Sequence, residues 1–527
     1  MHHPLEYLTV EANHDRLTRR HFVGRAAALG VSAAAANVFL VDAARAAGPV
    51  KGGTLKIGMD AGASTDSLDP AKYAGVSHVF NSCWGEGLVR LTAGGDLDPR
   101  LATEWSSTPD AKVWTFKIRK GVLFHNGREM TPDDVVATVQ RHAGPDTKSV
   151  LLGSMRGIES VKRNGDTVVF SMKVANADLP YMLADKRLVI QPNGGNDAPA
   201  AAIGTGPYKL GSNEPGVRLT GVRFANYWAP NLRGHAEQIE ILVLNDSLAR
   251  MTALQTGRVH MIIRVEPKVI DLIKRVPAIT VHATPGKAHQ VFAAWCNTAP
   301  FSNLDLRLAL KFAINRKELV EKILHGFGSI GNDYPINGSY PLYTALPQRE
   351  FDPDKAAFHY KKSGVSDPLV LRTSEVAFPG AVDAAQLFQS HCTKAGIKME
   401  IKREPADGYY AQVWLKQPFV ASRWNGRPTQ DEQYSTVYVT GADWNETRYL
   451  NPKFDAMVLA ARSELNQAKR KTMYQDIAQV IHSDGGAIIP MFNDIVDAVG
   501  PKVGGYQKNP NGGLMDGQAA VECWLES

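Results

Sequence analysis

The chain contains 527 residues, of which 44% are apolar and 21% are charged, a composition typical of a soluble globular protein. This length exceeds what a single compact core supports, so we expect two or three domains. The formal net charge is +6, and it is +5 without residues 1–46, because 54 basic and 49 acidic residues then remain. No run of more than three consecutive Lys or Arg residues is present, which argues against a nucleic-acid partner.

The first 46 residues have the pattern of an export signal. Arg19-Arg20 precedes a weakly apolar stretch over residues 26–41, and Ala44-Arg45-Ala46 provides the small residues of a cleavage site. Adjacent arginines before such a stretch indicate a twin-arginine signal. A membrane anchor is the alternative, but the stretch is shorter than the ~20 residues of a spanning helix. We therefore predict a cleaved signal over residues 1–46 and a periplasmic mature protein.

The cysteines are widely spaced, at Cys83, Cys296, Cys392 and Cys523. They form no CxxC motif and no Cys/His pair at metal-ligand spacing. An oxidising compartment would permit disulfides, so pairing stays open. For Cys83 and Cys392, which lie in apolar helical patterns, a buried free thiol is the expected state.

The first half of the chain alternates strand and helix patterns. Residues 54–58 predict a strand, residues 76–89 a helix, and Val113 to Ile118 a half-buried strand. Thr131-Pro132-Asp133-Asp134 is typical of a helix start, with a hydroxyl cap, an early proline and acidic groups at the positive end of the dipole. Asn164-Gly165 between two β-rich runs predicts a tight hairpin.

The second half contains well-punctuated helices. We expect one over residues 304–313, and a second that starts at Asn315, whose cap is completed by Glu318, and ends at His325-Gly326. A third is expected over residues 451–483. Irregular alternation of strands and helices favours an α/β architecture with mixed sheets.

A set of short motifs, in this order and spacing, resembles the family 5 extracellular solute-binding proteins. These are the dipeptide- and oligopeptide-binding components of bacterial ABC importers, of the cluster C type. The motifs are Gly52-Gly53-Thr54-Leu55, Ser67-Leu68-Asp69-Pro70, Glu86-Gly87-Leu88, Val113-Trp114-Thr115-Phe116, Arg119-Lys120-Gly121-Val122, Phe124-His125-Asn126-Gly127, Thr131-Pro132-Asp133-Asp134-Val135, Gly204-Thr205-Gly206-Pro207-Tyr208, Asn226-Tyr227-Trp228, Gly257-Arg258-Val259-His260, Pro300-Phe301, Arg307-Leu308-Ala309, Ala313-Ile314-Asn315 and Asn451-Pro452-Lys453-Phe454-Asp455.

The resemblance implies a two-lobed periplasmic-binding-protein fold of class II, with an extra subdomain in the first lobe. The segments would be lobe I (47–90), the extra subdomain (91–185), lobe I (186–285), lobe II (286–487) and the return to lobe I (488–527). It also implies hinge closure around a ligand, favoured when the ligand touches both lobes. ABC permease subunits would be the partners of a monomer that makes and breaks no bond.

The segment Trp424-Asn425-Gly426-Arg427 is the main candidate for ligand contact. In the peptide-binding relatives that the chain resembles, an acidic residue three positions after the tryptophan holds the ligand ammonium. Arg427 stands at that position here, and a guanidinium favours a carboxylate or phosphate, which accepts two parallel hydrogen bonds. Alternatively, Arg427 is solvated or pairs with Asp431 or Glu432.

Three further places are candidates by resemblance. Tyr73, Ala74, Gly75 and Val76 match a segment whose backbone can pair with an extended ligand. Trp444 and Asn445 lie in a loop that the family directs to the cleft, and His289 lies near the expected crossing between lobes. Each also has a purely structural alternative, and Trp295 and Tyr409 are expected in the core.

The sequence contains no catalytic motif of the G-x-S-x-G or H-E-x-x-H type and no phosphate-binding glycine loop, so we expect no enzyme, cofactor or metal site. The predicted ligand is a modified or acidic peptide, an opine-like conjugate or an oligosaccharide derivative. The alternatives are a metal chelate or haem carried by the same fold, an exported hydrolase, and presentation of the ligand to a chemoreceptor instead of a permease.

Overall fold

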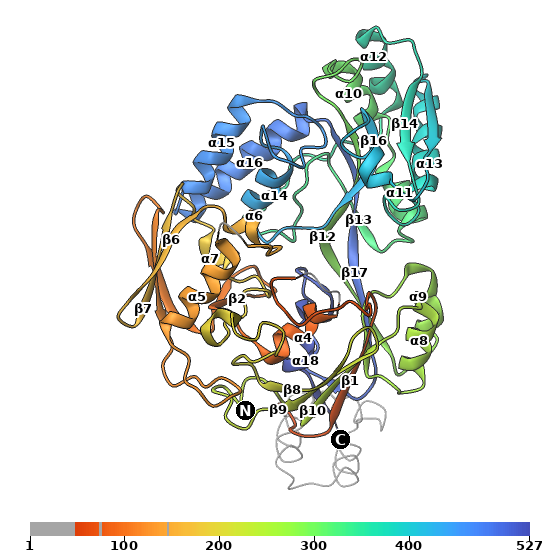
Figure 1. Ribbon diagram of the computed structural model, residues 1–527. Helices are drawn as coiled ribbons and strands as arrows, with labels where there is room; N and C mark the ends of the chain where they lie inside the picture. The colour runs from red at the N-terminus through yellow and green to blue at the C-terminus, as the bar shows by residue number, and fades with distance from the viewer. Residues whose placement is uncertain (1–47, 73–75, 145–146, 527) are drawn as a thin grey trace, which may run out of the picture.

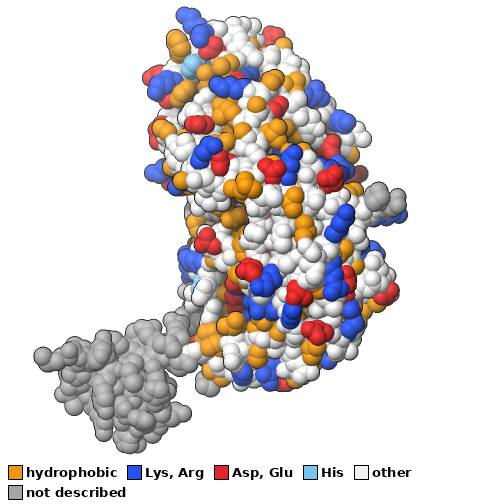
Figure 2. Space-filling view, turned by 90° about the vertical axis from the view of Figure 1, so that its left-hand side faces the viewer, with side chains coloured by type: hydrophobic (Ala, Val, Ile, Leu, Met, Phe, Trp, Pro, Cys, Tyr) orange, Lys and Arg blue, Asp and Glu red, His pale blue; other side chains and the backbone are white. Residues whose placement is uncertain are grey.

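The computed structural model describes residues 48–72, 76–144 and 147–526. They form an α/β structure with two lobes, one above the other in Figure 1. The predicted export signal lies outside the described residues. None of the helices in these ranges has the length and apolar character needed to span a membrane. On the face in Figure 2, basic and acidic side chains are interspersed, without a large patch of one sign.

One large mixed sheet extends through both lobes. Its strand order is β15 (Met399–Arg403), β14 (Leu369–Thr373), β16 (Phe419–Trp424), β12 (Thr280–Ala294), β17 (Ala487–Val499), β11 (Met261–Ile262), β1 (Thr54–Met59), β10 (Gln238–Val243), β9 (Arg218–Arg223) and β8 (Tyr208–Glu214), with β13 (Gly328–Ile330) also paired to β17. The pairs of β1 with β10 and β11, and of β14 with β15 and β16, are parallel, while the other pairs are antiparallel. The mixed sheet and the strand expected at residues 54–58 are therefore confirmed.

Strands β12 and β17 continue from one lobe into the other (Figure 1). They pair from Thr280↔Val499 to Ala293↔Ala487, with an interruption between Pro285 and His289. Residues 286–288 thus leave the ladder in the middle of β12. Because both strands belong to both lobes, the sequence-based boundaries at 285/286 and 487/488 stay a proposal.

The first lobe packs short helices against β1, β8 and β9. Its apolar core includes Leu55, Ile57, Phe80, Tyr208 and Val521. The helices are α4 (Ser77–Trp84), α8 (Ser247–Gln255), α9 (Pro267–Lys274), α17 (Gly513–Asp516) and α18 (Ala519–Glu522), and the short strands are β2 (Val89–Leu91), β3 (Leu97–Pro99), β18 (Val503–Gly504) and β19 (Trp524–Leu525).

The helix expected over residues 76–89 is wrong in its second half, since α4 ends at Trp84. Gly85 is extended, and a Cβ atom there would lie 2.1 Å from Cγ1 of Val189. The next residue, Glu86, is buried and accepts hydrogen bonds from Tyr227 (2.9 Å) and Trp228 (2.6 Å). These distant contacts outweigh the helical pattern, because a buried carboxylate needs partners.

A separate four-stranded unit follows β3 of the first lobe in the chain. It contains β4 (Ala102–Ser107), β5 (Val113–Ile118), β7 (Thr167–Met172) and β6 (Ile158–Asn164) in that order, with α5 (Pro132–Ala143), α6 (Leu152–Met155), α7 (Leu179–Met182) and the turn η1 (Pro192–Gly195). The strand β5 and the hairpin at Asn164-Gly165 are confirmed, and Gly165 has a φ of 59°. The helix start at Thr131 is confirmed as a reciprocal cap with Asp134.

The second lobe has its own apolar core, which includes Phe292, Leu310, Phe388, Tyr474 and Ile488. Its helices are α10 (Leu304–Phe312), α11 (Arg316–Ile323), α12 (Pro353–Ser363), α13 (Ala381–Lys394), η2 (Tyr409–Val413), α14 (Gln430–Val437), α15 (Pro452–Ser463) and α16 (Gln467–Asp484). The helix expected over 304–313 and the Asn315 cap are confirmed, although α11 ends two residues before His325.

The single helix expected over residues 451–483 is wrong, because the structure has two. Asn466 begins the second helix by accepting a hydrogen bond from the backbone N–H of Lys469 (3.0 Å). Between the helices, Leu465 packs against the apolar core of the four-stranded unit. The asparagine cap within the apolar pattern and the tertiary contact of Leu465 therefore separate the two helices.

All four cysteines are free. Cys83, Cys392 and Cys523 are buried, and burial raises the pKa of each thiol. The expected buried thiols at Cys83 and Cys392 are confirmed.

Candidate functional site

The segment Trp424–Arg427 lies directly against the crossing strand β12. Trp424 is the last residue of β16 and pairs with His289. Two residues later, a Cβ atom on Gly426 would lie 2.0 Å from Cβ of Lys287, so only glycine fits this approach. The sheet therefore places Trp424, Gly426 and His289, three residues predicted from sequence, beside the interruption in β12.

A buried carboxylate orients the tryptophan of this segment. Glu446 accepts hydrogen bonds from Trp424 Nε1 (2.7 Å), Trp414 Nε1 (2.7 Å) and Ser422 Oγ (2.6 Å). Burial raises the pKa of the Glu446 carboxyl, while these three donors act in the opposite direction. Because both indole N–H groups bond the same side chain, the two rings are fixed relative to one another.

The aromatic rings continue from this anchor towards solvent. The centroid of Trp424 lies 6.2 Å from that of Trp414 and 6.0 Å from that of Trp444. Trp424 is only 6% exposed, whereas Trp444 is 46% exposed. Aromatic side chains of this kind commonly line binding sites for small organic molecules. We call Trp414, Trp424 and Trp444 the aromatic wall.

Arg427 lies at the outer end of the aromatic wall. Its guanidinium carbon is 5.7 Å from the centroid of Trp444, within the range of a cation–π contact. Its backbone N–H donates to the hydroxyl of Tyr340 (3.2 Å). In the part of the chain that the structure describes, no carboxylate forms an ion pair with Arg427, and its buried Nε has no hydrogen-bond partner.

Neither Asp431 nor Glu432, the two internal partners expected for Arg427, forms a direct ion pair with it among the described residues. Asp431 accepts from Nε of Arg462 at 3.1 and 3.0 Å, so its carboxylate is occupied. Glu432 is partly buried, and burial raises its pKa to about 7, although the charge of Arg427 acts in the opposite direction. Glu432 therefore influences Arg427 as a nearby group without direct contact, and the N–H donors of the guanidinium are not used by either carboxylate.

Lys287 adds a second cation to this segment. Its Nζ donates to Asn511 Oδ1 (2.7 Å) and to the carbonyl of Pro428 (3.4 Å), next to Arg427. Burial lowers the pKa of Lys287 to about 8, against the attraction of Asp516 and Glu432. Sequence analysis did not identify Lys287, because its contacts with Gly426 and Asn511 join residues that are far apart in the sequence.

The other predicted residues differ in their environments. Asn425 is exposed, and His289 is buried with its Nδ1 3.3 Å from the carbonyl of Lys287 and its Nε2 without a partner. Burial lowers the pKa of His289 to about 4, so it is neutral at pH 7. Asn445 is next to Trp444, but its Nδ2 and Oδ1 bond the backbone of Tyr449 (2.9 and 3.0 Å). A loop-shaping role thus accounts for its side chain.

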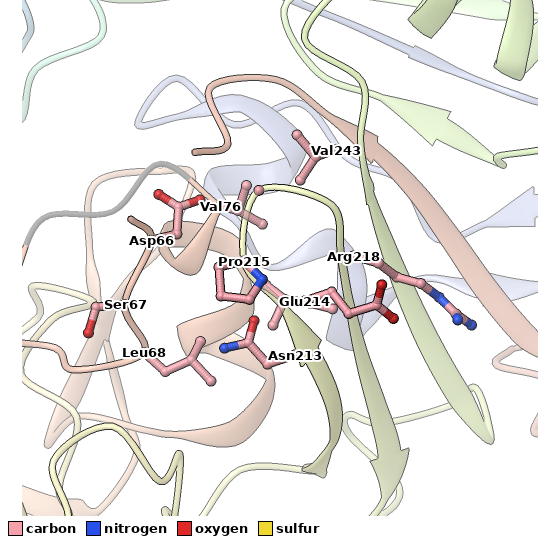
Figure 3. Close-up of a pocket in the computed structure, with 11 residues that line it drawn as sticks. Asp66, Ser67, Leu68, Val76, Asn213, Glu214, Pro215, Arg218 and Val243 are labelled. Carbon is pink, nitrogen blue, oxygen red and sulfur yellow. The ribbon is translucent and has the colours of Figure 1, made fainter. Parts of the chain in front are cut away.

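The predicted contacts Tyr73, Ala74 and Gly75 lie outside the described residues. Val76, the next residue, is buried in the first-lobe core and lines a small cavity with Asp66, Leu68 and Pro215 (Figure 3). The cavity volume is about 10 Å³, which is room for about one water molecule. This cavity is too small for a peptide-sized ligand, so the aromatic wall remains the candidate site.

Trp295 and Tyr409 are confirmed as core residues, since both are buried and the hydroxyl of Tyr409 donates to Ala421 (2.7 Å). Among the described residues, no group of three or more His, Cys, Asp or Glu side chains is arranged to hold a metal ion. The candidate site comprises the aromatic wall, Arg427 and Lys287.

Comparison with known proteins places the chain among binding proteins. Residues 96–446 match the family described as bacterial extracellular solute-binding proteins, family 5 Middle. The heme-binding protein A of Haemophilus influenzae is 26% identical over 474 residues, covering 81% of this chain and 84% of that protein. The di/tripeptide-binding protein 1 of Pseudomonas aeruginosa is 24% identical over 480 residues, covering 82% and 88%.

Solved structures show the same fold. The structure of HbpA2 from Haemophilus parasuis superposes with a TM-score of 0.80 at 21% identity, covering 90% of this chain and 100% of that one. The family match extends over more than half of the chain, from Asp96, shortly before the four-stranded unit, to Glu446. The chain therefore belongs to the family 5 bacterial extracellular solute-binding proteins.

Proposed function

We propose that this protein is the periplasmic solute receptor of an ABC importer. It captures a peptide-sized organic ligand between its lobes by hinge closure and delivers it unchanged to permease subunits in the cytoplasmic membrane. Family membership, the two-lobed fold and the crossing strands β12 and β17 support this proposal. We further propose export by the twin-arginine route and a monomeric mature protein.

The ligand carries an anionic group that binds Arg427. The observation behind this step is that the Arg427 guanidinium, stacked on Trp444, has no carboxylate partner among the described residues. An ammonium within ~4 Å of this guanidinium would be repelled by ~4 kcal/mol at an effective dielectric constant near 20. A carboxylate or phosphate would instead accept two parallel hydrogen bonds, and Lys287 nearby adds to the positive potential.

These features favour a modified or acidic peptide, an opine-like conjugate or an oligosaccharide derivative. The aromatic wall supplies apolar contact for any of them, since stacking requires only a flat or aliphatic face. Simple dipeptides with a free amine at the Arg427 position are disfavoured.

A metal chelate or haem is the second candidate. The similarity to the heme-binding protein A of H. influenzae favours it, because that relative is 26% identical over most of both chains. Elemental analysis of the purified protein separates the two candidates: stoichiometric iron or nickel would overturn the metal-free ligand. An exported hydrolase is a third possibility, and turnover of a bound ligand during incubation would support it.

Native mass spectrometry of the protein as purified tests the proposal first, because tight ligands often co-purify. The molecule identified in this way is then titrated against wild type, Arg427→Ala and the control Arg156→Ala, whose side chain is exposed on the four-stranded unit. Loss of a charged hydrogen-bond partner should weaken binding to Arg427→Ala by about 2–4 kcal/mol. A loss below about 0.5 kcal/mol, equal to that of the control, would contradict the anion site.

A further inference from the structure

A buried ion pair connects the second lobe to the four-stranded unit. Arg470 on α16 donates through Nη1 to Oδ1 of Asp178, which immediately precedes α7, at 2.6 Å. The two side chains are only 2% and 4% exposed. Beside this pair, the backbone N–H of Ala177 donates to the carbonyl of Arg462 at 2.8 Å. In Figure 1, α15 and α16 lie above the four-stranded unit.

Each partner is fixed by its own side of this contact. Arg470 also donates through Nε to the carbonyl of Ala461 (3.0 Å) and through Nη2 to the hydroxyl of Tyr474 (3.0 Å), which belongs to the second-lobe core. Asn176 holds the backbone of Asp178 in place, because its Oδ1 accepts a hydrogen bond from the Asp178 N–H (2.8 Å). The next residue, Leu179, packs in the core of the four-stranded unit. Both charges are thus held in place for one another.

The four-stranded unit belongs mechanically to the first lobe. Glu86, which follows α4 of the first lobe, forms an ion pair with Arg100 at the entry to the unit. The same carboxylate accepts from Thr205 (3.2 Å) and Trp228 (2.6 Å), which lie after the unit in the chain. Movement of the lobes apart would therefore carry Asp178 away from Arg470.

The contact is also linked to the binding segment. Thr429, two residues after Arg427, caps α14 by accepting from the N–H of Glu432 (3.3 Å). Asp431 on α14 holds Arg462, and the carbonyl of Arg462 accepts from Ala177 across the interface. One short helix thus connects the candidate ligand contact to the interlobe contact.

We propose that Asp178 and Arg470 form an interlobe latch that stabilises the closed arrangement before any ligand arrives. This inference rests on the proposed function, in which the lobes close around a ligand. Removing one member leaves the other charge buried and unpaired in the closed arrangement, whereas the open arrangement returns that charge to water. Loss of either partner should therefore shift the equilibrium towards the open form and weaken every ligand by the same factor.

Hydrogen exchange on ligand-free protein tests the latch. The Ala177 amide is the reporter, since its acceptor belongs to the other side of the interface. In Arg470→Met and, separately, Asp178→Asn, we expect exchange in residues 174–182 to accelerate by at least about tenfold. The control Lys471→Met alters the exposed neighbour of Arg470 on the same helix and should leave exchange unchanged.

The pattern of exchange distinguishes opening from unfolding. Acceleration confined to residues 174–182 and 462–470, with β12 and β17 as protected as in wild type, supports the latch. Unchanged exchange at 174–182, or equal acceleration throughout β12 and β17, overturns it. Because no ligand is present, this result is independent of the anion site, which the ligand titration of Arg427→Ala tests separately.

Discussion

Replacement of Glu446 by glutamine should loosen the aromatic wall without a large change in volume. The carboxylate accepts from two indoles and one hydroxyl, with Trp424 on Oε1 and Trp414 and Ser422 on Oε2. A glutamine has one acceptor oxygen and one NH₂ group. If its oxygen takes the place of Oε2, the NH₂ group faces the N–H of Trp424, and two donors then meet without an acceptor.

The expected cost follows from this single lost bond. A buried donor without a partner costs about 1–3 kcal/mol, so the free energy of unfolding of Glu446→Gln should fall by that amount. Glu446→Ala leaves all three donors without this acceptor and also creates a cavity, so it should cost about 3–5 kcal/mol. Glu446 is itself 1% exposed, so solvent does not replace the carboxylate directly.

Urea unfolding, followed by far-UV circular dichroism, measures these differences, and near-UV circular dichroism reports the packing of the tryptophans. Glu159→Gln is the matched control, because Glu159 is exposed on β6 and the change should stay within ±0.5 kcal/mol. If Glu446→Gln were as stable as Glu159→Gln and kept the near-UV spectrum of wild type, the anchoring role of Glu446 would be wrong.

Two further predictions concern pH and thiol chemistry. Burial lowers the pKa of His289 from 6.5 to about 4. The imidazole of the unfolded chain therefore binds a proton more tightly than that of the folded protein. The free energy of unfolding should fall by up to ~3 kcal/mol as the pH drops from 6.5 to 4. His289→Gln should remove this part of the pH dependence in denaturant titrations, and an unchanged slope would contradict it. Cys83, Cys392 and Cys523 are buried and Cys296 is partly exposed, while burial raises the pKa of all four thiols. A thiol reagent should therefore label Cys296 or no cysteine in the native protein, and all four cysteines after unfolding. Rapid native labelling of the other three would refute this.

Local sequence signals predicted the elements whose ends are determined locally. The Asn315 and Thr131 caps and the Asn164-Gly165 hairpin appear as expected, because each depends on side chains within a few residues. The helix expected over 451–483 failed because Asn466 offered a second cap and Leu465 had a partner in the four-stranded unit. A periodic apolar pattern does not report such distant partners.

The candidate site likewise contains residues that local sequence identified and residues that it did not. The Trp424–Arg427 segment was found from its residue types, and the structure places it against the crossing strand. Glu446 and Lys287 were missed, because their importance arises from pairing between β12 and β16 and from a loop that returns to Trp424. Neither relation is visible from neighbouring residues in the sequence.

A crystal structure of the protein with its co-purified ligand tests the central claim most directly. We expect the ligand to lie against the aromatic wall and touch both lobes, with an anionic group hydrogen-bonded to the guanidinium of Arg427. A ligand bound outside the space between the lobes, or one that presents a cationic group to Arg427, would contradict the account.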